Sequence, residues 1–393
     1  MVEAAADRRS ARFAARRTLW SESSLSRVRH CGSSLCGRAD GGKTGGRFVV
    51  VKLSNGKAGF GGLQTCASAW ACPVCSQKIA STRSVEVQNT VDEWEKRGGR
   101  VVFLTLTMRH HKGQKLSDLW DALSHAWGKV TSGGAWVKNA DDFGVRLPRV
   151  VRSGAKKGET VWSNRIPYIR AVEVTHGAKG WHVHIHSVLF VKEEITDKGV
   201  KMLGESIYGR WAKALVSKGL TSPTPLHGVD VKLVAVGDAE AVGKYVAKND
   251  YTANEAPNKK LNGTGWEVVG GAGKTARGKN RTPFQILADV VSAGDADDLA
   301  LWHVFEKASK GRRQLTWSVG LRELLGLNEE KTDEEIAEEE LGGEVVMVIT
   351  VEEWRVLRWR SCEVLSWAEA GADKKLMFKL MKLGFEPAPE EME

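Results

Sequence analysis

Hydrophobic and polar positions alternate in regular patterns between residues 81 and 251. Runs rich in β-branched and aromatic residues predict strands at 101–108, 168–175, 181–190 and 229–236. Amphipathic patterns predict helices at 81–97, 115–131, 202–218 and 238–249. The order of strand, helix, strand hairpin, helix, strand and helix favours an antiparallel α+β domain over a doubly wound parallel sheet.

Segments of different composition flank this central domain, 81–251. Before it we expect a basic, loosely ordered arm at 1–29 and a Cys-rich module at 30–80. After it we expect a Gly/Lys-rich linker at 252–283 and a helical DNA-binding or packing region at 284–327. An acidic C-terminal region, 328–393, would add a strand and a terminal helix near 363–383.

Charge is unevenly distributed along the 393 residues, whose net charge is +10. Residues 328–393 hold 18 acidic and 8 basic residues, which leaves 50 basic and 30 acidic residues, a net +20, in residues 1–327. A body this basic favours a polyanionic partner, most simply nucleic acid. The acidic region could compete with DNA for this basic body.

The chain also lacks the hydrophobic segments of membrane and secreted proteins. No run approaches the roughly 18 apolar residues of a transmembrane helix. The N-terminal sequence carries charges throughout and is not a secretory signal. We therefore expect a reducing cytoplasm, where clustered cysteines bind metal more often than they pair.

Five of the six cysteines lie close together in the sequence, which predicts a zinc module. Tetrahedral zinc needs four ligands, and the region has few apolar residues to hold itself together without a metal. Three ligands would come from residues 66–75, and the fourth is either Cys31 or Cys36, with His30 a poorer candidate. The expected set is Cys66, Cys72, Cys75 and Cys31, with Cys36 as the alternative fourth ligand.

Three histidines alternate with apolar residues in the predicted strand at 181–190. His182, His184 and His186 would share one face, because side chains alternate across a strand. Glu173 on the preceding strand could complete a divalent-metal site. A simple five-residue loop at 176–180 would place Glu173 opposite Val183, on the wrong face. A bulge, or a loop one residue longer or shorter, would bring it level with His182 or His184.

One of the four tyrosines lies in a pattern that suggests chemistry. Tyr245 and Lys248 are three residues apart in the predicted helix 238–249, so both side chains can address one phosphate. Tyrosine is a poor nucleophile at neutral pH, since its pKa is about 10. A metal that polarises the phosphate, with Lys248 offsetting charge, would make its attack feasible.

Together these motifs resemble a known family. Phe103-Leu104-Thr105-Leu106-Thr107, His184-Ile185-His186 and Lys244-Tyr245-Val246-Ala247-Lys248 occur in the order found in rolling-circle plasmid replication initiators of the HUH endonuclease superfamily, in its actinobacterial branch. The segments CGSSLC and TCASAWACPVC resemble that family's Cys-rich stretch. The resemblance covers roughly residues 30–326.

The resemblance implies an activity, cofactors and partners. Such proteins nick one strand at a double-strand origin with Mg²⁺ or Mn²⁺, join a tyrosine to the 5′ phosphate, and leave a 3′-OH primer. Carried over, Tyr245 is the nucleophile, Lys248 positions the phosphate, and His184, His186 and Glu173 bind the catalytic metal. His182 and Glu240 are additional candidates, because the carboxylate that some members carry four residues before the tyrosine is Ala241 here. Expected partners are plasmid origin DNA, single-stranded DNA and a host helicase; Zn²⁺ would be structural.

Two other functional hypotheses remain. The same chemistry serves conjugative relaxases and single-tyrosine transposases, although relaxases usually place the tyrosine before the His motif, and such transposases are shorter and lack the Cys module. A zinc-containing DNA-binding regulator without catalysis is a reading from a different class. That regulator would need no metal at the His strand and would tolerate Tyr245→Phe.

Overall fold

A computed structural model describes residues 2–36, 48–150, 154, 157–246 and 280–382. It divides the chain into two compact units, residues 76–331 and residues 1–75 with 332–393. The predicted linker at 252–283 falls almost wholly outside the described residues. The domain boundaries drawn from the sequence stay predictions.

The unit at 76–331 is built on a five-stranded sheet in the order β8-β3-β7-β6-β9. Every pair of neighbours is antiparallel, which confirms the predicted fold class. The strands are β3 (Arg100–Leu106), β6 (Tyr168–Gly177), β7 (Gly180–Val191), β8 (Val229–Leu233) and β9 (Leu315–Trp317). A separate two-stranded ribbon consists of β4 (Val145–Val150) and β5 (Thr160–Arg165).

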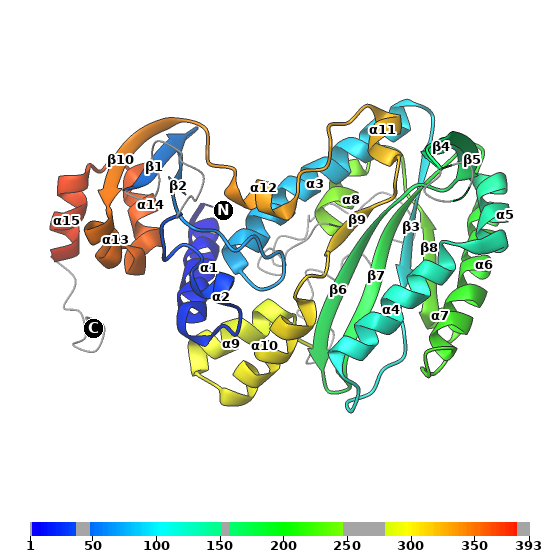
Figure 1. Cartoon of the computed structure of the whole chain (residues 1–393), viewed down its shortest axis with the longest axis horizontal. Helices are drawn as coiled ribbons and strands as arrows, with labels where there is room; N and C mark the ends of the chain where they lie inside the picture. Colours follow the sequence, from blue (N-terminus) through cyan, green and yellow to red (C-terminus); the bar gives the residue numbers. More distant parts are fainter. Residues whose placement is uncertain (1, 37–47, 151–153, 155–156, 247–279, 383–393) are drawn as a thin grey trace. The chain divides into compact units, whose positions relative to one another are not determined.

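Helices cover both faces of this sheet (Figure 1). One face packs against α4 (Leu116–Val130) and α6 (Asp197–Val216). The other packs against α3 (Pro73–Lys96), α8 (Ala239–Val246) and α11 (Leu321–Leu325) in one hydrophobic core. The remaining helices of the unit are α5 (Gly133–Phe143), α7 (Pro225–Gly228), α9 (Pro283–Ala293) and α10 (Ala296–Ser309).

The unit that holds both ends of the chain contains a three-stranded sheet in the order β10-β1-β2. Its strands are β1 (Phe48–Ser54), β2 (Lys57–Gly61) and β10 (Glu344–Thr350). The pairing of β1 with β10 joins two segments that the sequence reading assigned to different domains. Its helices are α1 (Val2–Glu22), α2 (Ser26–Arg29), α12 (Asp333–Glu338), α13 (Val351–Leu357), η3 (Arg358–Arg360), α14 (Ser361–Glu369) and α15 (Lys374–Lys382).

One local expectation was wrong, and one local alternative is resolved. Residues 1–29 were expected to be loosely ordered, but α1 is a 21-residue helix. It buries Ala15 and Leu19 completely or nearly so, and Arg9 forms an ion pair with Glu369, so tertiary contacts stabilise it. The simple five-residue loop at 176–180 is in fact a two-residue turn, and Glu173 lies level with His184, an outcome that the sequence left open. None of the described helices is long and apolar enough to cross a bilayer.

Candidate active site and metal centres

The β6–β7 hairpin sets the geometry of the histidine strand. Gly177 pairs with Gly180, so the connection has only two residues, Ala178 and Lys179, in place of the five expected. Gly180 adopts φ +87°, and a Cβ there would lie 2.9 Å from the Cα of Lys112, which explains the glycine. The shorter turn shifts the register by one residue relative to the simple five-residue loop.

That register places Glu173 directly opposite His184. The Glu173 Oε2 atom lies 3.3 Å from Nε2 of His184 and 3.2 Å from Nε2 of His186. Both imidazoles are largely buried, at 9% and 5% exposed. The three side chains form a group that could hold a metal ion. Their oxygen and nitrogens converge on one point, as the alternation of strand side chains predicts.

The spacing within this triad suits a hexacoordinate ion. Ligands about 2.1 Å from an octahedral ion lie about 3.0 Å from their neighbours, close to the distances from Glu173 to the two rings. Two imidazoles and one carboxylate on one face leave the remaining coordination positions open. The site can therefore bind a divalent cation and still accept oxygen atoms from a substrate.

Tyr245 lies beside this triad. Its hydroxyl is 3.4 Å from Nε2 of His186, and the two rings meet edge to face with centroids 5.0 Å apart. Tyr245 comes from α8, which the core places on the same face of the sheet. Phe103 of β3 packs against both rings, at 5.3 Å from Tyr245 and 5.6 Å from His186. The phenol oxygen is thus held next to the candidate metal position.

One of the other predicted site residues, Glu240, is not part of the triad. Glu240 is exposed and forms an ion pair with Lys244. It precedes Tyr245 by five residues, so the two side chains point about 140° apart around the helix. Lys248, like Tyr251, lies outside the described residues.

His182 extends the row of imidazoles without joining the triad. Its ring stacks on His184 with centroids 4.8 Å apart, and His110 stacks on its other side, also at 4.8 Å. Burial lowers the pKa of His182 to about 3, so the ring is neutral at physiological pH. No sequence pattern assigns a role to His110, although its place just after the predicted strand at 101–108 is a usable signal.

Thr105 is a second residue whose contact with the triad no sequence pattern predicts. Its hydroxyl lies 3.1 Å from Nδ1 of His186, directly across the β3–β7 pair. An imidazole that binds a metal through Nε2 carries its proton on Nδ1, and that proton needs an acceptor. The Thr105 oxygen can accept it, which would fix the tautomer and the orientation of the His186 ring.

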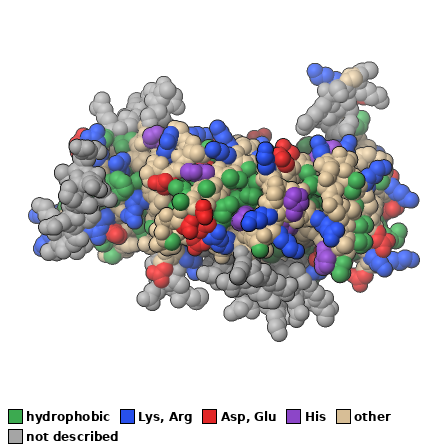
Figure 2. Space-filling view, turned by 90° about the horizontal axis from the view of Figure 1, so that it is seen from below, with side chains coloured by type: hydrophobic (Ala, Val, Ile, Leu, Met, Phe, Trp, Pro, Cys, Tyr) green, Lys and Arg blue, Asp and Glu red, His purple; other side chains and the backbone are tan. Residues whose placement is uncertain are grey.

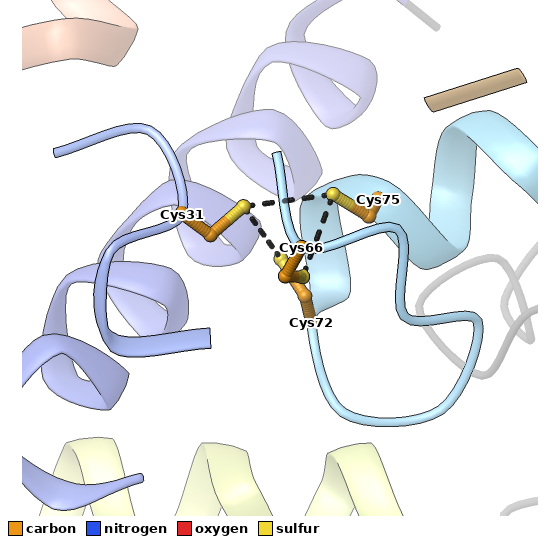
Figure 3. Close-up of side chains that lie close together, drawn as sticks. All are labelled: Cys31, Cys66, Cys72 and Cys75. Carbon is orange, nitrogen blue, oxygen red and sulfur yellow. Dashed lines mark hydrogen bonds between the residues drawn. The ribbon is translucent and has the colours of Figure 1, made fainter. Parts of the chain in front are cut away.

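The second candidate metal centre is the cysteine cluster (Figure 3). The four sulfurs converge on one point and are buried; they belong to Cys31, Cys66, Cys72 and Cys75. Sγ of Cys31 is 3.7 Å from Sγ of Cys72 and 3.6 Å from Sγ of Cys75, and Cys66 is 3.7 Å from Cys75. A tetrahedral ion with metal–sulfur bonds of about 2.3 Å places its sulfurs about 3.8 Å apart. The cluster therefore has the dimensions of a tetrahedral metal site.

The choice of the fourth cysteine was left open by the sequence. The structure brings Cys31, which precedes β1, to the other three and leaves Cys36 outside the cluster. Contact with the Cys31 thiol raises the pKa of both Cys66 and Cys72 and lowers the pKa of Cys75. Four adjacent thiolates would repel one another, and a cation at their centre would remove that repulsion.

Comparison with known proteins finds related sequences but no matching solved structure. "Protein rep" of Streptomyces lividans is 29% identical over 367 residues, which cover 80% of this chain and 77% of the relative. "Protein rep" of Streptococcus pneumoniae is 27% identical over 150 residues, 37% of this chain and 39% of the relative. The chain is similar to bacterial Rep proteins. This similarity confirms the resemblance that the motifs predict.

A shorter match carries a different name. The "Neomycin resistance protein" of Streptomyces cyanogenus is 31% identical over 165 residues, 36% of this chain and 34% of the relative. The Rep-like chain matches no protein-family model. No solved structure matches it significantly either.

Proposed function

We propose that this chain initiates plasmid rolling-circle replication by nicking one DNA strand at the double-strand origin. The position of Tyr245 carries the proposal: its phenol oxygen lies 3.4 Å from a ring of the candidate metal triad. The similarity to Rep proteins along 80% of the chain supports the same role. In this proposal Tyr245 is the nucleophile, and Glu173, His184 and His186 hold Mg²⁺ or Mn²⁺.

The chemistry of such a nick follows from these residues. A bound Mg²⁺ or Mn²⁺ would polarise the scissile phosphate. The Tyr245 oxygen forms a bond to phosphorus as it loses its proton to solvent, and the DNA 3′ oxygen leaves with its bonding electrons. The products are a 5′-phosphotyrosine link and a free 3′-OH that can prime synthesis. The reverse attack by a 3′-OH would rejoin the strand.

Other residues would position the phosphate and the ligands. Lys248 follows Tyr245 by three residues, and we propose that its ammonium group offsets charge on the phosphate. Phe103 and Thr105 would hold the Tyr245 and His186 rings in place through their contacts with them.

The cysteine cluster is proposed to bind structural Zn²⁺. Four thiolates favour zinc over Mg²⁺ or Mn²⁺, whereas the triad, which contains a carboxylate, suits the latter ions. Buried ligands leave no open position, so this ion would stabilise the fold around Cys31 and Cys75 without taking part in the reaction.

Partners follow from the proposed reaction. The substrate is plasmid origin DNA, which must expose a single strand at the nick, and a host helicase would unwind it after the nick. Lys and Arg side chains are spread over the surface seen in Figure 2, with His side chains among them. A basic surface of this kind can contact phosphates along bound DNA.

A cleavage assay tests the proposal. Purified protein is mixed with negatively supercoiled plasmid that carries its own coding locus, with Mn²⁺ or with EDTA. We expect a nick only with Mn²⁺, a nucleotide adduct on Tyr245 by mass spectrometry, and loss of both in Tyr245→Phe.

Tyr208→Phe provides a matched control, because it removes a phenol oxygen that bonds to the Pro223 carbonyl in the same unit. This variant should nick normally. An adduct on Tyr251 would keep the function and correct the nucleophile. Absence of any nick, together with EDTA-resistant DNA binding, would contradict the proposal and favour a non-catalytic regulator.

A further inference from the structure

The β4–β5 ribbon is a feature that the proposed reaction does not use. Where the structure describes the side chains of residues 145–165, the charged ones are Arg146, Lys157, Arg165 and Glu159, a net charge of +2. The two strands pair only with each other, and β4–β5 stands at the end of the main sheet where β6 begins (Figure 1). This ribbon is therefore a basic element of the unit that carries the candidate active site.

The two faces of the ribbon differ in chemistry. Val145 packs against the main hydrophobic core, and Leu147 is only 1% exposed, so these alternate positions form the inner face. Arg146, between them, is exposed and makes no ion pair with any residue that the structure describes. Asn164 lies directly across from Arg146 and is also exposed, and its Nδ2 donates a hydrogen bond to Oδ1 of Asp141 at 3.0 Å. The outer face thus presents the guanidinium donors of Arg146 to solvent.

An exposed tryptophan lies on the same outer face. Trp162 is two residues from Asn164 on β5, so both side chains point the same way, and it is 57% exposed. No other tryptophan in the described part of the chain ranks among the strongly exposed hydrophobic residues. The flat aromatic ring of Trp162 is therefore available to a partner, and tryptophan is enriched at interfaces. Lys157, in the loop that joins the strands, is exposed as well.

We propose that the outer face of the β4–β5 ribbon binds duplex DNA beside the nick site. A two-stranded ribbon fits the major groove, where arginine is suited to reading base edges. The cationic side chains of Arg146 and Lys157 complement the phosphates on either side of the groove, and the indole ring can pack against the sugar–phosphate backbone or a thymine methyl group. Single-stranded DNA, by contrast, is bound at the metal triad.

The fold limits how far this contact lies from the nick. Arg165, at the end of β5, precedes Glu173 of the triad by eight residues. At about 3.4 Å per residue their Cα atoms are at most about 27 Å apart, which is about eight base pairs of duplex. This placement rests on the proposed function, and it predicts that the ribbon protects base pairs within about one helical turn of the nick.

Duplex and single-stranded probes distinguish DNA binding by the ribbon from cleavage at the candidate active site. The double variant Arg146→Gln/Trp162→Ala of the full chain is titrated with duplex tiles of the DNA that flanks its coding sequence, and with the single strands of those tiles. We expect the affinity for duplex DNA to fall about 10- to 100-fold. The slope of the logarithm of the binding constant against the logarithm of the salt concentration should decrease in magnitude by about 1. Metal-dependent cleavage of the single strand should be unchanged.

The control variant Lys201→Gln/Met202→Ala removes one exposed cation and one exposed hydrophobic side chain from α6. It should bind duplex tiles like the wild type. Circular dichroism melting checks that both double variants fold, and Arg146→Glu alone gives a second test if Trp162→Ala does not. In that case Arg146→Glu alone should weaken duplex binding about 10- to 100-fold.

Three results would overturn the proposal: unchanged duplex affinity in folded variants, an equal loss of duplex binding and single-strand cleavage, or a change of oligomeric state with duplex affinity intact. The last would mean that the ribbon binds a second copy of the chain. If wild-type protein cleaves no single-stranded DNA, the proposed nicking function is contradicted. Loss of duplex binding in the variants would still measure the contribution of the ribbon to duplex affinity.

Discussion

A single hydroxyl group supports the orientation of the metal triad. Thr105 is 3.1 Å from Nδ1 of His186, and its strand places it opposite that histidine. Contacts of this kind fix the tautomer of a metal-binding imidazole and raise its basicity. Because the hydroxyl does not itself touch the candidate metal position, Thr105 is a positioning residue.

We predict that Thr105→Val weakens Mn²⁺ binding at the triad about 10- to 100-fold with little change in stability, since valine keeps the shape of threonine. Isothermal titration of the chain with Mn²⁺ measures the affinity. Thr175→Val, opposite His182 on the same sheet face, is the matched control and should bind Mn²⁺ normally. Equal effects of the two substitutions would show that the Thr105 contact is not specific.

At the scale of elements, the cysteine cluster ties together segments that are far apart in the sequence. Cys31 follows α2, Cys66 lies in the segment after β2, and Cys75 lies in the first turn of α3. Their sulfurs already have the spacing of a tetrahedral site. A metal ion there would connect these three segments through their side chains.

Cys72→Ser is therefore expected to reduce zinc content from about one ion per chain to near zero and to lower the melting temperature, because a structural zinc ion contributes directly to folding. Elemental analysis and thermal melting measure the two effects. Cys36→Ser should retain zinc and melt normally, since Cys36 is outside the cluster. Zinc loss in Cys36→Ser alone would reverse the assignment of the fourth ligand.

At the scale of the whole molecule, the acidic C-terminal region is part of a folded unit. β10 pairs with β1 along six residue pairs. Met347, Ile349 and Trp354 are buried in one core with Val49 and Val51. The idea that residues 328–393 compete with DNA therefore cannot be tested cleanly by deleting them, because deletion also removes eight of the ten buried residues of that hydrophobic core.

We predict that deletion of residues 344–393 unfolds the unit formed by both chain ends. Loss of each large buried side chain costs about 2–5 kcal/mol, and several are lost at once, which exceeds the usual 5–15 kcal/mol stability of a domain. Limited proteolysis should then cleave within residues 1–75. The variant Glu338→Gln/Glu344→Gln/Glu352→Gln, which neutralises exposed acids, should stay folded and tests the charge effect alone.

The sequence by itself determined the elements and the chemical types of the site. Alternation placed His182, His184 and His186 on one face, and the cysteine spacing identified a four-sulfur site, because both patterns depend on local geometry. The helix that carries Tyr245 was predicted for the same reason. The ribbon at 145–165, with its irregular apolar pattern, and the short strand β9 were missed.

Tertiary structure decided the questions that depend on distance in space. The turn at Ala178-Lys179 set the register that brings Glu173 to His184, which local patterns left open. The fold also selected Cys31 over Cys36 and brought β10 to β1, almost 300 residues away in sequence. A sequence pattern specifies which face a side chain occupies, whereas the partner it meets depends on how separate elements pack.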